Sequence, residues 1–290
     1  MADPFLKWPG GKRWLARQID SLLPSAYERY LEPFLGGGAV FFHLSPRRAI
    51  LSDSNKELIN VYRCLRDHVE EIDERLASLQ RRHCEAVYYR TRAMAPIDPV
   101  GRALRFIYLN RTCFNGIYRV NLKGEFNVPM GTKDLIEYPK DYLNGVAATL
   151  RRASIRKLDF EKAIDMATAG DFVYLDPPYT VMHNNNNFVK YNARLFSWED
   201  QIRLAAAIKR AAGRGAAIML SNADHQHVRE LYKGFGYHRS VNRASILAAE
   251  PQHRRITTEL IVTNYPPKEK ERGGPLPPKS TSRANSSFAV

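Results

Sequence analysis

The stretch Phe172-Val173-Tyr174-Leu175-Asp176-Pro177-Pro178-Tyr179 joins an apolar run to a carboxylate, two prolines and an aromatic ring. A short apolar run of this kind predicts a buried strand, and the polar and rigid residues follow at its carboxyl end. In open α/β sheets, ligands bind outside the carboxyl ends of the strands. We therefore expect a binding site here. A strand that ends in a proline-rich turn is the alternative interpretation of these residues taken alone.

Asp176 and the carbonyl of Pro177 form a pair of hydrogen-bond acceptors in this interpretation. Proline lacks an amide donor and has a fixed φ, so the backbone stays extended and its carbonyl stays free of ladder bonding. Two neighbouring acceptors suit a flat donor such as an exocyclic amine, and Tyr179 offers a stacking face for the ring that carries it. The candidate catalytic residues are therefore Asp176, Pro177, Pro178 and Tyr179.

Upstream, residues 30–53 follow the order strand, glycine loop, helix, strand. Gly36, Gly37 and Gly38 follow the first apolar run, and the second run, Ile50-Leu51-Ser52-Asp53, ends in a carboxylate. Glycine lets a backbone approach a ligand closely, and an acid after the second strand binds ribose hydroxyls in doubly wound nucleoside-binding folds. Because the GxGxxG spacing is absent, we expect a nucleoside without phosphates. A generic tight turn is the alternative for the glycines.

The chain begins with a glycine-rich turn, Phe5-Leu6-Lys7-Trp8-Pro9-Gly10-Gly11-Lys12, followed by an amphipathic helical pattern over residues 13–23. The spacing does not match a Walker A phosphate loop. We expect this turn to contact a polar small molecule.

Composition fits one large domain, or a domain with an insertion, in a reducing compartment. The chain has 290 residues, 44% of them hydrophobic, and three widely spaced cysteines. We see no run of 18 apolar residues, no signal segment, no disulfide framework and no zinc cluster. His225, His227 and His253 form no metal pattern with nearby carboxylates, and no Ser-His-Asp or cysteine nucleophile stands out.

The net charge of +14 is concentrated in the middle of the chain. Residues 80–123 contain nine Lys or Arg against two acids, interleaved with aromatic residues. This pattern indicates a polyanionic partner, nucleic acid above all; a solvated helix face is the alternative. Asn-Gly and Lys-Gly pairs between residues 110 and 131 predict hairpin or loop geometry, where Asn and Arg side chains contact base edges.

The strand–helix alternation places this basic segment as a mainly helical insertion in an α/β sheet. A helical pattern covers residues 56–73, and strands are expected over residues 153–160, 216–220 and 260–265. We expect a discontinuous catalytic domain of residues 1–56 and 150–267, an insertion of residues 57–149, and a disordered Pro/Lys/Ser-rich tail of residues 268–290.

In this order, the motifs resemble those of the Dam-type (D12 class) DNA adenine-N6 methyltransferases. The matching segments are residues 5–12, 32–38, 52–55, 110–121, 124–131 and 176–179. The resemblance implies a Rossmann-like fold, S-adenosylmethionine as methyl donor, S-adenosylhomocysteine as product, double-stranded DNA as partner, and a target-recognition role for the insertion of residues 57–149. It also implies a cytoplasmic monomer with no membrane partner, acting alone or beside a restriction or defence system.

The resemblance assigns three groups of residues. The catalytic group is the Asp176 to Tyr179 segment already described. The cofactor group comprises Trp8, Pro9, Gly10, Gly11, Lys12, Glu32, Pro33, Phe34, Gly36, Gly37, Gly38, Asp53, Asn55, Asp159, Phe160 and Asp176. The DNA group comprises Arg90, Arg92, Arg111, Asn115, Gly116, Ile117, Tyr118, Arg119, Asn121, Pro129, Lys133, Tyr191 and Arg243, and no metal ligand is expected.

The expected reaction is direct methyl transfer to N6 of an adenine that is flipped out of the duplex. Tyr179 would stack on that adenine, with Tyr191 or Phe196 as the other wall. Arg119 matches an arginine that contacts guanine in relatives that methylate GATC. However, Thr132 and Lys133 stand where such relatives tend to have an arginine and an aromatic residue. GATC is the first expectation for the target; a non-catalytic nucleic-acid-binding protein and an N4-cytosine or RNA methyltransferase are the alternatives.

Overall fold

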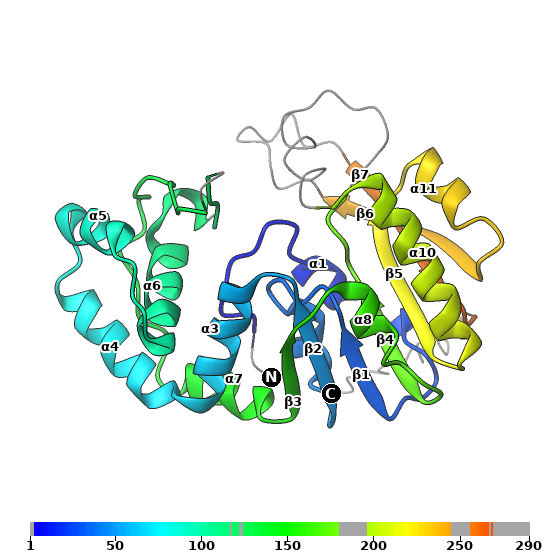
Figure 1. Ribbon diagram of the computed structural model, residues 1–290, viewed down its shortest axis with the longest axis horizontal. Helices are drawn as coiled ribbons and strands as arrows, with labels where there is room; N and C mark the ends of the chain where they lie inside the picture. Colours follow the sequence, from blue (N-terminus) through cyan, green and yellow to red (C-terminus); the bar gives the residue numbers. More distant parts are fainter. Residues whose placement is uncertain are drawn as a thin grey trace, which may run out of the picture.

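A computed structural model of the chain describes residues 3–116, 118–121, 124–179, 196–244, 256–266 and 268. Its centre is a seven-stranded sheet with the order β3-β2-β1-β4-β5-β7-β6 (Figure 1). Neighbouring strands from β1 to β5 pair in parallel, and β7 pairs antiparallel with β5 and β6. The α/β class predicted from the sequence is therefore confirmed. The strands are β1 (Arg29–Glu32), β2 (Ala49–Asp53), β3 (Ala153–Lys157), β4 (Asp171–Leu175), β5 (Ala217–Ala223), β6 (Tyr237–Ala244) and β7 (Ile256–Thr263).

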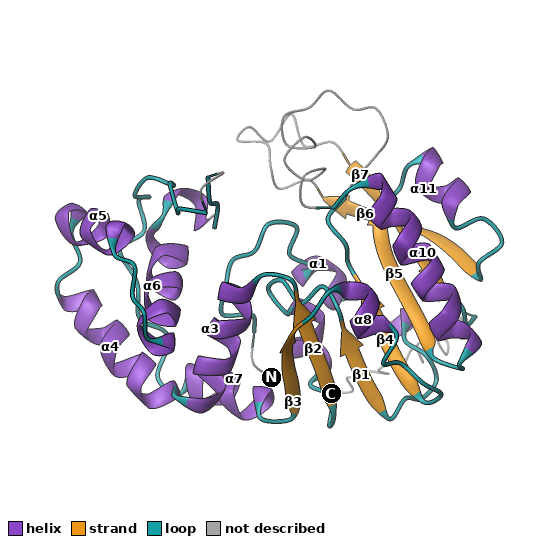
Figure 2. Ribbon diagram, in the orientation of Figure 1, coloured by secondary structure: helices purple, strands orange, loops and turns teal. Residues whose placement is uncertain are grey.

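Helices precede, connect and flank these strands (Figure 2). The first half of the chain contributes α1 (Arg13–Ala16), the 3-10 turn η1 (Ile19–Leu22), α2 (Ala39–Leu44), α3 (Lys56–Asp67), α4 (Val69–Arg81), α5 (Glu85–Ala93), α6 (Pro99–Thr112) and the 3-10 turn η2 (Phe114–Gly116). The rest of the chain contributes α7 (Tyr142–Leu150), α8 (Phe160–Ile164), α10 (Trp198–Gly213) and α11 (Gln226–Leu231).

The apolar run of β4 is buried on both faces, as is usual for a strand inside a parallel sheet. Phe172 and Tyr174 belong to a core cluster shared with α1, α2, α3 and α6. Val173 and Leu175 point to the other face and pack with α8, α10 and α11. This alternation holds the end of β4, and hence Asp176, between two packed layers.

Helices α4, α5 and α6 lie to one side of the sheet, beyond α3 and α7 (Figure 1). Asn55 caps α3 by accepting hydrogen bonds from the amides of Glu57 and Leu58, and Asp98 caps α6, where Pro99 takes the first position. Buried α6 side chains such as Phe106 and Ile107 belong to the same core cluster as the adjacent sheet face. The division into separate domains stays a prediction.

Five of the expected elements have wrong boundaries. The strand expected over residues 216–220 is β5 (Ala217–Ala223), and the strand expected over residues 260–265 is β7 (Ile256–Thr263). The helical pattern of residues 56–73 is divided at His68 into α3 and α4, and residues 13–23 form two short pieces, α1 and η1, instead of one helix. The strand expected to reach residue 160 ends at Lys157, because the Asp159 side chain accepts a hydrogen bond from the amide of Glu161 and so begins α8.

Candidate active site

Three carboxylates lie after the ends of neighbouring parallel strands. Glu32 is the last residue of β1, Asp53 is the last residue of β2, and Asp176 directly follows β4. Strand β1 lies between β2 and β4 in the sheet. The chain adds β2 and β3 on one side of β1, and then adds β4 and β5 on the other side. This reversal is the topological switch point at which open α/β sheets bind ligands.

The glycine loop after β1 is fixed by Asp53 and by two aromatic side chains. Asp53 Oδ2 accepts a hydrogen bond from the amide of Gly36 at 3.1 Å, and Tyr62 donates to the Gly36 carbonyl at 3.0 Å. Gly36 has a φ of +47°, and a Cβ there would lie 2.7 Å from Cδ1 of Trp8. Gly38 has a φ of +65° and caps α2. Only glycine fits these two positions without strain, and Trp8 packs directly over the loop.

Burial controls the charge of the carboxylates at this site. Glu32 is 3% exposed and accepts a hydrogen bond from the Tyr30 hydroxyl at 2.9 Å. Desolvation raises the pKa of Glu32 well above its usual value, and the nearby Asp176 and Asp53 carboxylates add to the increase. Burial also raises the pKa of Asp53, although amide donors of Asn55 and Gly36 oppose that shift. The site therefore favours a cationic ligand that stabilises the ionised carboxylates.

Aromatic rings from three elements meet beside the carboxyl end of β3. Phe34 stacks on Phe160 with ring centroids 5.3 Å apart, and Phe196 contacts both rings. Asp159 lies next to this group and pairs with Arg203 at 3.0 Å. Four residues of the predicted cofactor group thus lie close together: Asp159 and Phe160 lie next to Phe34, and Pro33 is buried directly before Phe34.

The N-terminal turn separates into exposed and buried residues. Pro9, Gly10 and Gly11 are exposed, and the amide of Gly11 donates to the carbonyl of Trp8 at 3.1 Å. Lys12 is 4% exposed, and its ammonium reaches the end of β4. Lys12 Nζ lies 3.0 Å from Asp176 Oδ1 and 2.5 Å from the Tyr179 hydroxyl. The structure therefore brings Lys12 to the predicted catalytic residues.

Two residues near the Lys12 ammonium, Glu259 and Ser221, were not predicted from the sequence. Glu259 of β7 is 2% exposed and lies 3.2 Å from Lys12 Nζ, and Ser221 of β5 donates to Glu259 Oε2 at 3.1 Å. A charged residue directly before the apolar run Leu260-Ile261-Val262 is the signal that could have indicated Glu259. Burial raises the pKa of Tyr179, and the Asp176 and Glu259 carboxylates raise it further, so this phenol stays protonated.

The N-terminal turn is joined to the predicted DNA-binding segment through Asn110. The Asn110 amide group donates to the carbonyls of Lys7 and Gly116, and its Oδ1 accepts from the amide of Lys7 at 3.0 Å. Tyr118 stacks on Phe106 with centroids 4.0 Å apart and also faces Trp8. Lys7 and Asn110 both lie in motifs identified from the sequence, but their contact with each other was not predicted.

The predicted DNA-binding residues include arginines that hydrogen-bond to the protein's own backbone and residues that are exposed to solvent. Arg111 donates to the carbonyls of Leu135 and Glu137 and lies over the Tyr138 ring, and Arg92 donates to the carbonyl of Val128. These two arginines hold the loop that precedes α7 and the segment before Pro129. Arg90, Asn115, Arg119, Pro129 and Lys133 are exposed, and the backbone of Asn115 has a φ of 56°.

Two short antiparallel bridges, Cys113 to Met130 and Val120 to Phe126, give the predicted hairpin geometry. Within it, Asn121 accepts from the amide of Glu125, and Arg119 Nε donates to Asn127 Oδ1 at 3.3 Å. Lys133 lies near Lys7; burial lowers the pKa of Lys7, and the Lys133 charge lowers it further. Ile117 and Tyr191 lie outside the described residues, and Arg243 falls in β6 with its side chain undescribed.

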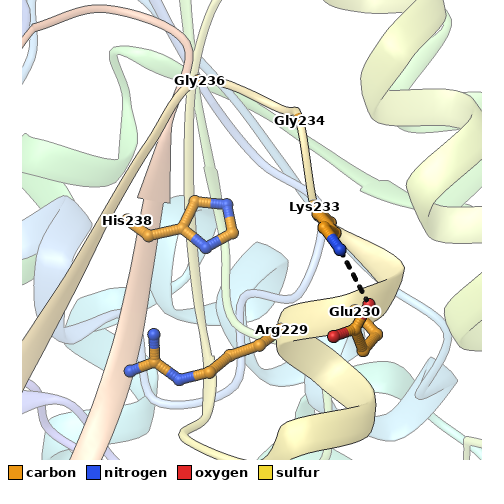
Figure 3. A pocket seen from close by; sticks show the side chains of 6 residues that line it. All are labelled: Arg229, Glu230, Lys233, Gly234, Gly236 and His238. Atoms are coloured by element: carbon orange, nitrogen blue, oxygen red, sulfur yellow. Dashed lines mark ion pairs between the residues drawn. The ribbon is translucent and has the colours of Figure 1, made fainter.

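A pocket of about 370 Å³ on α11 and β6 contains none of the predicted residues (Figure 3). It is lined by Arg229, Glu230, Lys233, Gly234, Gly236 and His238. Arg229 already pairs with Asp224 at 2.6 Å, and Lys233 lies 3.8 Å from Glu230. We assign this pocket no ligand.

In the described part of the chain, no three His, Cys, Asp or Glu side chains are arranged to hold a metal ion. None of the helices described is both long and apolar enough to cross a membrane.

Comparison with known proteins identifies relatives along most of the chain. Residues 8–246 match the family described as D12 class N6 adenine-specific DNA methyltransferase. The chain is 41% identical to the type II methyltransferase M1.LlaDCHI of Lactococcus lactis subsp. cremoris, over 90% of this chain and 95% of that protein. It is 36% identical to the type II methyltransferase M.MjaIII of Methanocaldococcus jannaschii (90% and 99%), and 35% identical to the DNA adenine methylase of Escherichia coli strain K12 (90% and 95%).

Proposed function

Because the chain belongs to the D12 class of N6 adenine-specific DNA methyltransferases, we propose that it methylates N6 of an adenine flipped out of double-stranded DNA, with S-adenosylmethionine as donor. The observation that carries this proposal is the position of Asp176, which follows β4 at the topological switch point beside Glu32. Pro177 and Pro178 follow it and supply a carbonyl acceptor on a rigid backbone.

The residues present fit S-adenosylmethionine. Buried Glu32 and partly buried Asp53 suit a ligand that carries a sulfonium and an ammonium, and Asp53 lies where ribose hydroxyls bind in doubly wound folds. The glycine loop has no space for a Cβ at Gly36, because Trp8 packs against it, so glycine is needed there for the chain to turn tightly beside the proposed donor site. When bound, S-adenosylmethionine supplies a methyl group activated by its sulfonium sulfur.

The chain's own residues prepare the adenine amine. Its lone pair is delocalised into the ring, so the free amine is a poor nucleophile. Asp176 and the Pro177 carbonyl accept hydrogen bonds from its two N–H groups, which frees the lone pair and offsets positive charge that develops on nitrogen in the transition state. The N6–methyl bond forms as the methyl–sulfur bond breaks, S-adenosylhomocysteine departs, and N6 gives up one proton, which Asp176 is placed to accept. Tyr179 offers the ring on which the flipped base stacks. Alignment of the amine with the methyl group supplies a further part of the acceleration.

Transfer of tritium from S-[methyl-³H]adenosylmethionine to DNA tests the function, followed by hydrolysis to identify the labelled base. Label on N6-methyladenine supports the proposal. Label on N4-methylcytosine or in RNA, or binding without any transfer, would support one of the alternative functions in its place.

The target sequence, the association with a restriction nuclease, the oligomeric state and the cellular compartment are also proposals. We propose GATC as the first target to test, with Arg119 as the guanine contact; Thr132 and Lys133, which depart from the pattern of GATC-specific relatives, are exposed as well. Two relatives carry names of type II methyltransferases, which supports a role beside a restriction nuclease. We further propose a monomer that acts in the cytoplasm, where its DNA substrate lies. Modification-sensitive sequencing of DNA from cells that express the protein identifies the target directly.

Replacing Arg119 with Ala should relax specificity. Arg119 is exposed, and its guanidinium donates to the Asn127 side chain, so it is presented to solvent in a fixed orientation. A bidentate arginine–guanine contact contributes about 1–3 kcal/mol of discrimination, so methylation of the cognate duplex should fall roughly tenfold to a hundredfold. The matched control is Arg90→Ala on α5, for which we expect weaker binding to all duplexes and a smaller salt dependence. Equal losses on cognate and altered duplexes in Arg119→Ala would contradict the assignment.

Replacing Glu32 with Gln should stabilise the protein while weakening binding of the donor. Burial raises the pKa of Glu32, so its ionised form destabilises the fold as pH rises from the unfolded-state pKa through the folded-state pKa. The neutral amide avoids this cost and still accepts from Tyr30, so Tm at pH 8 should rise by roughly 2–4 °C. Because a cationic ligand favours ionised Glu32, wild-type affinity for S-adenosylmethionine should increase with pH over the same range.

Thermal unfolding measures the expected change in Tm. Calorimetric titration with S-adenosylmethionine at several pH values measures the expected change in affinity. In Glu32→Gln the contribution of this group to the pH dependence should disappear. A variant with lower Tm at pH 8 and unchanged affinity would show that Glu32 is only a structural residue.

A further inference from the structure

The Lys12 ammonium occupies the place proposed for the substrate amine. It lies 3.0 Å from Asp176 Oδ1, hydrogen-bonds to the Tyr179 hydroxyl and lies 4.4 Å from the centroid of the Tyr179 ring. The carboxylate and this ring are the two groups assigned to the amine and the ring of the flipped adenine. An adenine that binds Asp176 Oδ1 through its amine and stacks on this ring therefore has to displace the ammonium from that oxygen.

An ammonium in this position cannot simply be released. Lys12 is 4% exposed, and an uncompensated buried charge strongly destabilises a folded protein. The movement therefore requires a second anion within reach of the same nitrogen atom.

Glu259 provides this second anion. Its two carboxylate oxygens lie 3.2 Å and 3.4 Å from Lys12 Nζ. The carboxylate is 2% exposed and is oriented by the Ser221 hydroxyl. Strand β7, which carries Glu259, is paired on both sides, with β5 and β6, so the acceptor is held on a rigid part of the sheet. Lys12 thus reaches Asp176 and Glu259 at the same time, and a small displacement changes which carboxylate it favours.

We propose that Glu259 is a positioning residue for methyl transfer: it retains the Lys12 ammonium while the adenine amine takes its place on Asp176. This role, which rests on the proposed function, is not a contact between Glu259 and substrate. It acts through Lys12. Without the Glu259 charge, Lys12 pairs more strongly with Asp176, and the incoming amine competes with a cation for the carboxylate.

The test measures single-turnover methylation by the full-length protein, with S-[methyl-³H]adenosylmethionine and a duplex that carries the target identified by sequencing. Glu259→Gln should lower the rate roughly tenfold to a hundredfold, the range of coupling between groups in one network. Affinities for S-adenosylhomocysteine and for the duplex should change little. Glu259→Asp, which keeps the charge, should recover most of the rate.

A double-mutant cycle with Lys12→Met separates the proposed role from a purely structural one. If Glu259 acts through Lys12, adding Glu259→Gln to Lys12→Met should cause little further loss of rate. Fully additive losses, or a wild-type rate in Glu259→Gln, would overturn the proposal. The double variant removes both members of the ion pair and so leaves no unpaired buried charge. It can therefore be compared with Lys12→Met even when Glu259→Gln alone fails to fold.

Asp171→Asn is the matched control, because Asp171 is also a buried, ion-paired carboxylate, 4% exposed and 2.6 Å from Arg29, but at the opposite end of β4. We expect lower thermal stability and an unchanged rate per folded molecule. A rate loss in Asp171→Asn that equals the loss in Glu259→Gln would assign both effects to stability and overturn the proposal. Wild-type protein that labels no adenine would instead contradict the proposed function itself.

Discussion

Replacing Asp176 with Ala should abolish methylation and leave DNA binding largely intact. Asp176 follows β4 at the switch point and is the acceptor assigned to the adenine amine. Loss of a single group that stabilises transition-state charge costs about 10²–10³-fold in rate, and loss of the group that also orients the nucleophile should reach at least this range. Duplex affinity should remain because contacts to phosphates supply most of it.

The fold should tolerate this change because Lys12 keeps a second carboxylate. In Asp176→Ala the ammonium still has Glu259 within 3.4 Å, so no buried cation is left without a partner. Single-turnover rates, duplex affinity by fluorescence anisotropy and thermal unfolding check the three parts. Near-normal turnover in this variant would refute the mechanism, and loss of duplex binding together with folded structure would refute the account of the ion pairs.

Replacing Asp53 with Ala should cause the largest loss of donor affinity. Asp53 accepts from the amides of Gly36 and Asn55, so it holds the glycine loop and the start of α3 in addition to its proposed contact with ribose hydroxyls. A hydrogen bond to a charged group contributes about 1.5–3 kcal/mol, which corresponds to roughly tenfold to a hundredfold for the ribose alone. Loosening of the loop should bring the loss to the upper end of this range or beyond.

Isothermal titration with S-adenosylhomocysteine measures this loss without turnover. Asp53→Asn separates charge from shape, since the amide oxygen still accepts one backbone hydrogen bond. Ser54→Ala is the matched control, because Ser54 is exposed next to Asp53 and should leave affinity unchanged. An Asp53→Ala protein with wild-type affinity would exclude Asp53 from the donor site.

The sequence was sufficient for those features that depend on one strand and the residues after it. The apolar run before Asp176 predicted a buried strand, and β4 is that strand. The runs that end in Glu32 and Asp53 likewise became β1 and β2, with the glycine loop between them. The parallel sheet then brings these strand ends together, since all three run in the same direction.

Long-range pairs could not be predicted in the same way. Glu259 is 247 residues from Lys12, and neither has a local pattern that indicates the other. Asn110 is likewise 103 residues from Lys7. The arginine pattern of residues 80–123 indicated a basic surface, but Arg111 and Arg105 donate to backbone carbonyls, and only the folded chain shows which arginines remain available to DNA.

The contacts of Asn110 and Trp8 constrain how this protein can be recombined with its relatives. Asn110 donates hydrogen bonds to the carbonyls of Lys7 and Gly116. Trp8 lies between the glycine loop and the ring of Tyr118. A chimera that exchanges residues 57–149 alone would separate partners that have to match in shape. A transplanted segment of residues 57–149 therefore has to be accompanied by its own N-terminal turn, although the two lie far apart in the sequence.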